Sequence, residues 1–153
     1  MELVTAMLVA AIGVSVAIPT WSRYRARERL RAEAALLAGA IREARTVATS
    51  GATGLDGWAP TDRVKAAGLN LAATEYEVYA DRDREADGVG EVVVRYRILP
   101  TTLRLDSAVD GVRIARDGTL VDDEEIEVVV TDTESSNALY VRVGFGGHVE
   151  VSP

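Results

Sequence analysis

Residues 1–21 read MELVTAMLVAAIGVSVAIPTW, and this stretch decides the fold. One acid, Glu2, stands before an apolar run, residues 3–18, that carries no charge. A membrane-spanning helix needs about 20 apolar residues, with a lower limit near 17, and the run just reaches that length when residues 19–21 are added. A lone carboxylate at the edge of such a segment is costly. We therefore expect Glu2 to serve assembly, by pairing with a positive group on another subunit.

Three interpretations of this segment compete: a cleaved signal peptide, a permanent single-span anchor, and a helix that leaves the membrane when subunits assemble. The apolar run is not preceded by a basic region, and the helical pattern continues past it, which argues against a signal peptide. Five arginines between residues 23 and 31 would hold the following domain in the cytoplasm under the positive-inside rule. That conflict stays open, and we favour the third interpretation.

Pro19 lies inside the helical pattern, where a proline removes one backbone hydrogen bond and clashes with the preceding turn. Gly13 and Ser15 lie just upstream and weaken the helix propensity of the same stretch. We therefore expect a kink or a local break between residues 13 and 19. This is also the place where the helix should bend or melt.

Past Trp21 the pattern changes from wholly apolar to one-sided. Apolar residues recur at steps of four and three, the spacing of one helix face: Leu30, Ala34, Leu37, Ile41, Ala44 and Ala48. We expect this face to pack on a sheet and the helix to end at Ser50-Gly51. A helix from near residue 2 to about residue 50 spans about 70 Å at 1.5 Å per residue. So long a helix on so small a protein must contact something beyond its own domain.

The C-terminal part is dominated by short β-rich segments. Gly- and Asp-rich turns separate them, which indicates an antiparallel sheet or sandwich. The expected strands cover residues 75–79, 92–98, 103–105, 112–114, 126–130, 139–143 and 148–151, and residues 61–67 are expected to form a short helix. The sequence thus predicts an α+β fold, in which a long N-terminal helix packs on an antiparallel β domain. Its parts are a hydrophobic segment (1–21), an amphipathic segment (22–50) and the β domain (51–153).

The charge is divided unequally along the chain. Residues 1–50 carry seven arginines and four acids, net +3, whereas residues 51–153 carry ten basic and twenty acidic residues, net −10. An acidic domain repels polyphosphate backbones, so nucleic acid is not an expected partner. The chain has no cysteine, and His148 is its only histidine, so no convincing catalytic pairing is available. We expect a non-enzymatic protein without a cofactor.

Acidic residues alternate along one short segment before Gly88: Asp81, Asp83, Glu85 and Asp87. Carboxylate oxygens at this spacing can wrap a calcium ion. However, the glycine comes two places later than in an EF-hand, two arginines intervene, and no bidentate glutamate follows. A solvated hairpin tip is the favoured interpretation, with calcium binding as the alternative.

Several motifs carry a resemblance to a known family. Glu2, the aliphatic run and Pro19, seventeen positions further on, resemble the class III signal region of type IV pilins and type II secretion pseudopilins. The helical stretch at residues 29–45 is similar to the minor pseudopilin group called GspH/FimT. So are the Asp-Gly turn at residues 116–120 and the closing hairpin at residues 140–151. The resemblance covers residues 1–50 well and residues 110–153 loosely.

The resemblance implies a pilin-like fold and a structural role. The chain would be a minor pilin or pseudopilin of a type IV pilus-like filament, serving type II secretion or pilus biogenesis. It would begin as a single-pass inner-membrane protein with its β domain in the periplasm, then enter a filament that reaches the cell surface. The implied partners are membrane lipid before assembly, other pilin or pseudopilin subunits through the N-terminal helix, and an inner-membrane assembly platform. Glu2 would pair with the N-terminal amine of the neighbouring subunit.

The chain departs from the family at its start. The family has a basic leader, a cleavage-site glycine and a methylated residue before the glutamate, and none of these is in the sequence. We expect Met1 to be an internal start, with prepilin peptidase as a further partner if a leader exists upstream. Two alternative functions stay open: a DNA-binding minor pilin in natural transformation, and a single-span membrane-anchored periplasmic domain.

Overall fold

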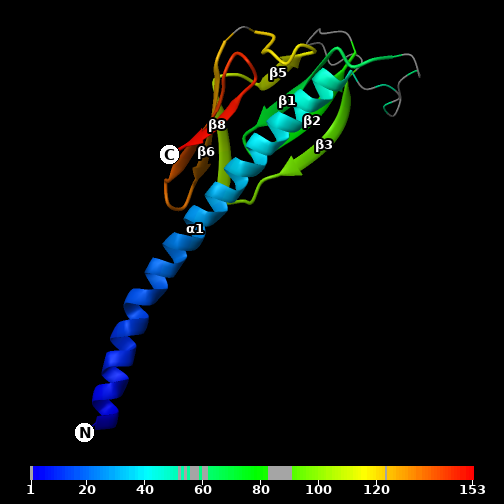
Figure 1. Ribbon diagram of the computed structural model, residues 1–153. Helices are drawn as coiled ribbons and strands as arrows, with labels where there is room; N and C mark the ends of the chain where they lie inside the picture. Colours follow the sequence, from blue (N-terminus) through cyan, green and yellow to red (C-terminus); the bar gives the residue numbers. More distant parts are fainter. Residues whose placement is uncertain are drawn as a thin grey trace.

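The structure is a computed structural model that describes residues 2–51, 53, 55, 59, 62–82, 91–122 and 124–153. Within the helix, side chains are described at residues 7, 15 and 18 and from residue 20 onward. One long helix, α1 (Glu2–Ser50), lies against two antiparallel sheets (Figure 1). The predicted α+β arrangement is confirmed.

Each sheet has four strands. The first has the order β3-β2-β1-β5 and contains β1 (Ala66–Ala72), β2 (Glu75–Asp81), β3 (Val92–Ile98) and β5 (Gly111–Ala115). The second has the order β4-β6-β7-β8 and contains β4 (Leu103–Ser107), β6 (Ile126–Asp132), β7 (Ala138–Val143) and β8 (Val149–Ser152). The edge strands are therefore β3 and β5 in the first sheet and β4 and β8 in the second. The second half of α1 lies across both sheets (Figure 1).

The core lies between α1 and the inner faces of the two sheets. The predicted helix stripe is buried along its whole length, from Leu30 to Ala48. Alternating strand residues complete the core, because successive side chains of a strand point to opposite faces. They include Val78, Val112, Ile114, Val128, Val130 and Val141. The stripe predicted from spacing alone is thus the side of α1 that joins the two sheets.

The helix ends where the sequence predicts. Its last residue is Ser50, and Gly51 follows with a φ of 58°. Glycine is the residue that most readily takes this left-handed conformation after a helix. The chain can therefore leave α1 at once and turn back toward the first sheet.

Strand β1 corrects a sequence-based expectation. Residues 61–67 were expected to be helical, but Ala66 and Ala67 belong to a strand that lies between β2 and β5. The segment is rich in alanine and glycine, which have low strand propensity, so local preference gave no signal. Packing requires Gly68, since a Cβ there would lie 2.1 Å from the backbone oxygen of Val112. Close approach to the neighbouring backbone explains the glycine.

The two C-terminal turns are present as predicted. In the Asp-Gly turn, Asp117 Oδ1 accepts a hydrogen bond from the Thr119 amide at 3.0 Å, and Gly118 has a φ of 86°. The closing hairpin joins β7 to β8, and the Gly144 amide donates to the His148 carbonyl at 3.0 Å. Both turns lie on the side of the domain that meets α1.

Candidate assembly helix

The two halves of α1 have different surroundings. From Leu30 onward one face is buried against the sheets, whereas Met7 and Ile18 are 66% and 64% exposed. Figure 1 shows the N-terminal half projecting away from the sheets as an extended rod. Most helical stability in proteins comes from packing of one face rather than from propensity. The projecting half therefore has a surface available for a partner.

Glu2 is the first residue of α1, and Pro19 lies within it. The side chains of both are outside the described residues, so the pairing of Glu2 stays a prediction. The backbone is helical without interruption through Gly13, Ser15 and Pro19, and the local break expected there is not part of this structure. Proline has a φ near the helical value, which lets a helix continue with one hydrogen bond missing. Bending or melting of this stretch during assembly stays a prediction.

Among the residues that the structure describes, no helix is both long and apolar enough to cross a membrane.

Aromatic and basic side chains cluster at the helix base, which we define as residues 18–29. The rings of Trp21 and Tyr24 stack with their centroids 6.1 Å apart, and the Arg25 guanidinium lies 5.2 Å from the Trp21 ring centroid. The spacings of three and four residues place these side chains on neighbouring positions of the helix surface. The four-residue spacing of Trp21 and Arg25 was the sequence signal for their contact, and this contact was not predicted.

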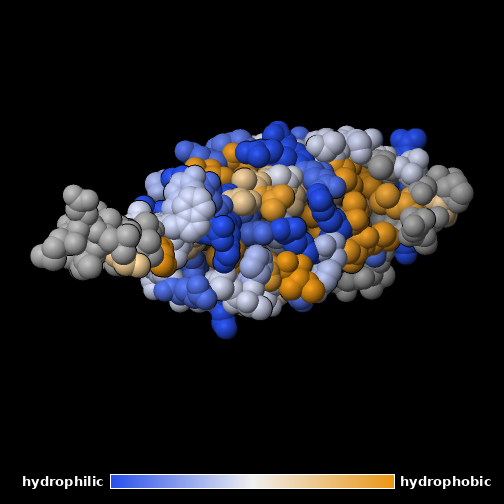
Figure 2. All heavy atoms as spheres, turned by 90° about the horizontal axis from the view of Figure 1, so that it is seen from below, coloured by the Kyte–Doolittle hydropathy of each residue, from blue (hydrophilic) through white to orange (hydrophobic). Residues whose placement is uncertain are grey.

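A cleft lies between the helix base and the turn that joins β6 to β7. Its volume is about 700 Å³, and its lining is Ile18, Trp21, Ser22, Arg25, Ala26 and Arg29 from α1 with Glu134 from the turn. Figure 2 views this end of the molecule, where tan and orange surface lies beside the grey atoms and pale and blue surface comes next. The sequence could not predict the cleft, because Glu134 lies more than one hundred residues from the helix base.

Two ion pairs fasten β3 to the packed half of α1. The Arg97 guanidinium donates to both carboxylate oxygens of Glu33, at 2.6 and 3.1 Å, and Arg95 donates to Glu43 at 2.9 Å. The hydrogen bond to buried Glu33 raises the pKa of Arg97. Arginines two apart on a strand point to the same face, so the sequence placed Arg95 and Arg97 together but did not show their partners. These pairs hold the edge strand against the helix.

Two arginines of α1 cap the C-terminal turns. Arg45 donates to the Gly147 carbonyl at 3.5 Å, and Arg42 donates to the Val149 carbonyl at 3.2 Å. A Cβ at Gly147 would lie 2.4 Å from the Gly118 oxygen, so the two turns touch each other there. The helix, the Asp-Gly turn and the closing hairpin therefore form one packed unit.

A buried polar cluster lies on the outer face of the first sheet. Arg113 donates to Asp81 at 2.6 Å, and Asp81 is fully buried. The Tyr79 side chain passes over Gly68 and its hydroxyl reaches Arg113. Gly68 has no side chain, and this leaves room for the tyrosine ring. Burial raises the pKa of Tyr79 to about 12. This cluster joins β2 to β5 across β1 and is structural.

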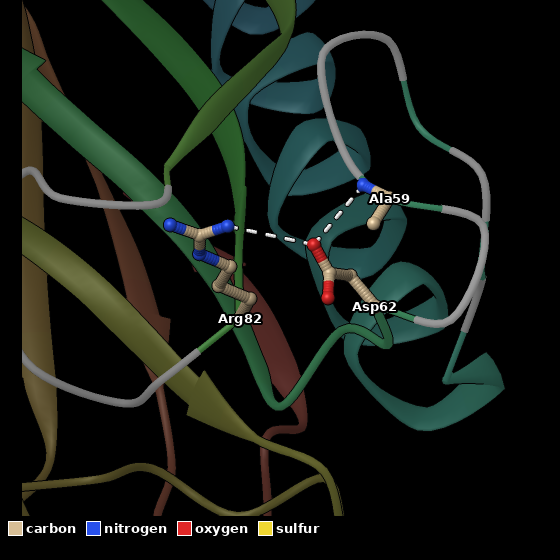
Figure 3. Close-up of polar contacts among 3 residues, drawn as sticks. All are labelled: Ala59, Asp62 and Arg82. Carbon is tan, nitrogen blue, oxygen red and sulfur yellow. Dashed lines mark hydrogen bonds and ion pairs between the residues drawn. The ribbon is translucent and has the colours of Figure 1, made fainter.

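The structure describes only the beginning of the predicted calcium segment. Asp81 accepts a hydrogen bond from Arg113. The next residue, Arg82, donates to Asp62 at 3.4 Å, and Asp62 also accepts from the Ala59 amide at 3.1 Å (Figure 3). Asp83, Glu85 and Asp87 lie outside the described residues. Among the residues that the structure does describe, no group of three or more His, Cys, Asp or Glu could hold a metal ion. Calcium binding at this segment stays a prediction.

Comparison with known proteins identifies the fold. No protein-family model matches the sequence, and no match is found among curated proteins. Among solved structures, the chain is similar to the type IV minor pilin FimU of Pseudomonas aeruginosa strain PAO1, in two crystal forms. The TM-scores are 0.62 and 0.60 at 16% identity, covering 83% and 81% of this chain and 90% and 93% of FimU. A long helix whose C-terminal half packs on two antiparallel sheets thus gives this chain a type IV pilin-like fold.

Proposed function

We propose that this chain is a structural subunit, a minor pilin or pseudopilin, of a type IV pilus-like filament. One observation carries the proposal: α1 projects beyond a domain whose fold is similar to that of a minor pilin. The projecting residues 2–29 span about 40 Å at 1.5 Å per residue. A rod of that length, whose described side chains are at most partly buried, is suited to contact other molecules.

The apolar run defines what those molecules must offer. Residues 3–18 carry no charge, and leaving so many aliphatic side chains in water is unfavourable. Lipid of the inner membrane would cover them before assembly, with the β domain in the periplasm. Helices of neighbouring subunits would cover them in the filament, after an inner-membrane assembly platform has moved the subunit. The proposed role is non-catalytic.

Glu2 is the proposed assembly contact within this rod. A carboxylate in an apolar environment is strongly destabilising unless it is paired. The N-terminal amine of a neighbouring subunit would supply the partner once the helices lie side by side. If the native protein has a leader, prepilin peptidase would expose that amine.

The test compares two glutamates of the same helix in cells that assemble the filament. Glu2→Ala should remain in the membrane fraction but be lost from sheared filaments. The matched control, Glu28→Ala, removes an acid whose ion pair among the described residues is with exposed Arg31, and it should be incorporated normally. Incorporation of Glu2→Ala at the unmodified level would exclude the pairing. Absence of the unmodified chain from all filament fractions would exclude the proposed function itself.

The identity of the machine is a separate question. Genes for sibling pseudopilins, a secretin and an ATPase beside this gene would indicate secretion, whereas a retraction ATPase would indicate pili. The DNA-binding alternative is not favoured, because residues 51–153 carry a net charge of −10 and repel a phosphate backbone. A gel shift with duplex DNA at physiological salt would revive it.

A further inference from the structure

We infer that the helix base binds the headgroup of an anionic phospholipid, with the lipid phosphate between Arg25 and Arg29. The inference deepens the proposed function and rests on it in one respect, because it places residues 3–18 in a bilayer before assembly. It adds a specific site to that general location: the cleft between α1 and Glu134.

The cleft has the size and the charge for a headgroup. Its volume of about 700 Å³ falls within the usual range for small-molecule sites, about 300–1,000 Å³. Arg25 and Arg29 lie one helical turn apart on the same wall, so a phosphate between them can accept from both guanidinium groups. Guanidinium is well suited to phosphate because its donors form a planar fork.

The two arginines are available for an anion. Among the described residues, neither Arg25 nor Arg29 has a hydrogen bond or ion pair, and the Arg25 guanidinium is positioned instead by the Trp21 ring. The nearest acid along the chain, Glu28, already accepts from Arg31 at 3.1 Å. An external anion therefore does not have to displace an internal partner.

The order of side chains along the cleft favours a lipid over a free phosphate or a protein surface. Ile18 lies at the end next to the apolar run, Trp21 follows, and the arginines lie nearest to the domain. This matches the sequence of layers in a bilayer: acyl chains, an aromatic belt, then phosphate. Glu134 on the opposite wall repels a bare phosphate dianion but can accept from a headgroup hydroxyl. Phosphatidylglycerol combines one phosphate charge with such hydroxyls.

The experiment measures partitioning of the full-length chain into vesicles by the fluorescence of Trp21. The chain has two tryptophans, so a Trp58→Phe background leaves Trp21 as the single fluorescent tryptophan. The vesicles are pure phosphatidylcholine or a mixture with phosphatidylglycerol, at physiological salt. The unmodified arginines should favour the anionic vesicles. Arg25→Gln with Arg29→Gln should reduce that preference by about 5- to 30-fold beyond the general loss from removing any two arginines, because both charge-assisted hydrogen bonds to the phosphate are also lost.

A matched control variant removes two arginine charges from another side of the helix. Arg23 and Arg27 do not line the cleft, so Arg23→Gln with Arg27→Gln should show only the general loss of attraction to the anionic surface. All four residues are exposed, and glutamine keeps the helix propensity, so the variants should fold. Circular dichroism checks this point.

Several results would overturn the inference. Equal losses in the two double variants would mean diffuse electrostatic attraction, and no preference for phosphatidylglycerol would mean no headgroup site. Full displacement by millimolar inorganic phosphate would identify a free-phosphate site instead. If the Arg25/Arg29 variant bound vesicles normally but was lost from filaments, the cleft would be a contact site for a neighbouring subunit and not for lipid. Vesicle partitioning needs no filament machinery, so its failure is distinguishable from failure of the Glu2 test.

Discussion

The projecting and packed halves of α1 belong to one unbroken helix, yet different forces hold them. From Leu30 to Ala48 the helix is part of the core, and its buried stripe joins the two sheets. Before Leu30 the described side chains are at most partly covered, and the ion pair and ring contacts recorded there join neighbours along the helix. The same secondary structure can therefore serve as a core element at one end and as a contact surface at the other.

The ion pairs of the two halves show the same difference. Glu33 in the packed half is buried and receives two hydrogen bonds from Arg97 on another element. Among the described residues, the ion pair of Glu28 in the projecting half is with Arg31, three residues along the same exposed surface. A surface pair of this kind contributes little, whereas a desolvated, bidentate pair resists separation. Substitutions that weaken the domain should therefore leave the projecting half unaffected, and the reverse should also hold.

The largest effect is expected where the domain contains a buried charge. Asp81→Asn should lower the free energy of unfolding by about 2–4 kcal/mol, because it leaves the largely buried Arg113 guanidinium without its fully buried counter-charge. The Nε of Arg113 already lacks a partner among the described residues. Chemical denaturation of the full chain in detergent measures the loss. As a control, Glu127→Gln breaks an exposed pair with Arg142 and should change little, and equal losses would contradict the argument.

The next effect separates the two faces of the packed half. Ile41→Ala removes a fully buried side chain between the sheets and should cost about 2–5 kcal/mol. Leu36→Ala, on the same turns of α1 but 43% exposed, should cost less than about 1 kcal/mol. Denaturant midpoints of the two variants test the comparison. A similar cost for both would mean that the helix does not pack by the observed face.

A smaller effect depends on pH and belongs to the domain alone. Burial raises the pKa of Tyr79 from 10.0 to about 12, so its phenol stays neutral in the folded state after it has ionised in the unfolded chain. The contribution of neutral Tyr79 to the free energy of unfolding is therefore complete below pH 10. It is lost between pH 10 and 12, at up to about 1.4 kcal/mol per pH unit. Thermal unfolding of Tyr79→Phe across that range should show a flatter dependence. A profile as steep as that of the unmodified chain would exclude Tyr79 as the cause.

The smallest effect is expected in the projecting half. The coupling between Glu28 and Arg31, measured by a double-mutant cycle, should be about 0.2–0.5 kcal/mol and should fall with added salt. The corresponding cycle for Glu33 and Arg97 should give a larger value that depends less on salt. A coupling of similar size in both cycles would remove the distinction between the two halves.

Local patterns made much of this fold predictable. The helix stripe, the glycine that ends α1 and the Asp-Gly turn depend on neighbours within a few residues, and all three are present as predicted. Strand β1 was missed because Ala66, Ala67 and Gly68 have no local strand preference. Its place between β2 and β5 arises from pairing with residues that lie far along the chain.

The candidate site divides in the same way. The apolar run, Glu2, Pro19 and the aromatic-basic residues of the helix base could all be recognised from the sequence. The cleft could not be recognised, because it needs Glu134 from the β6–β7 turn beside Arg25 and Arg29.

By itself, the sequence determined that this protein has a long helix with an apolar first half and a one-sided second half, followed by an acidic β domain. Short-range periodicity and composition carry that information, since they reflect which faces can be buried. Only the tertiary structure decided where the helix leaves the domain and which charges meet across it. Those outcomes depend on contacts between residues far apart in the chain, such as Glu33 with Arg97, and no local pattern encodes such contacts.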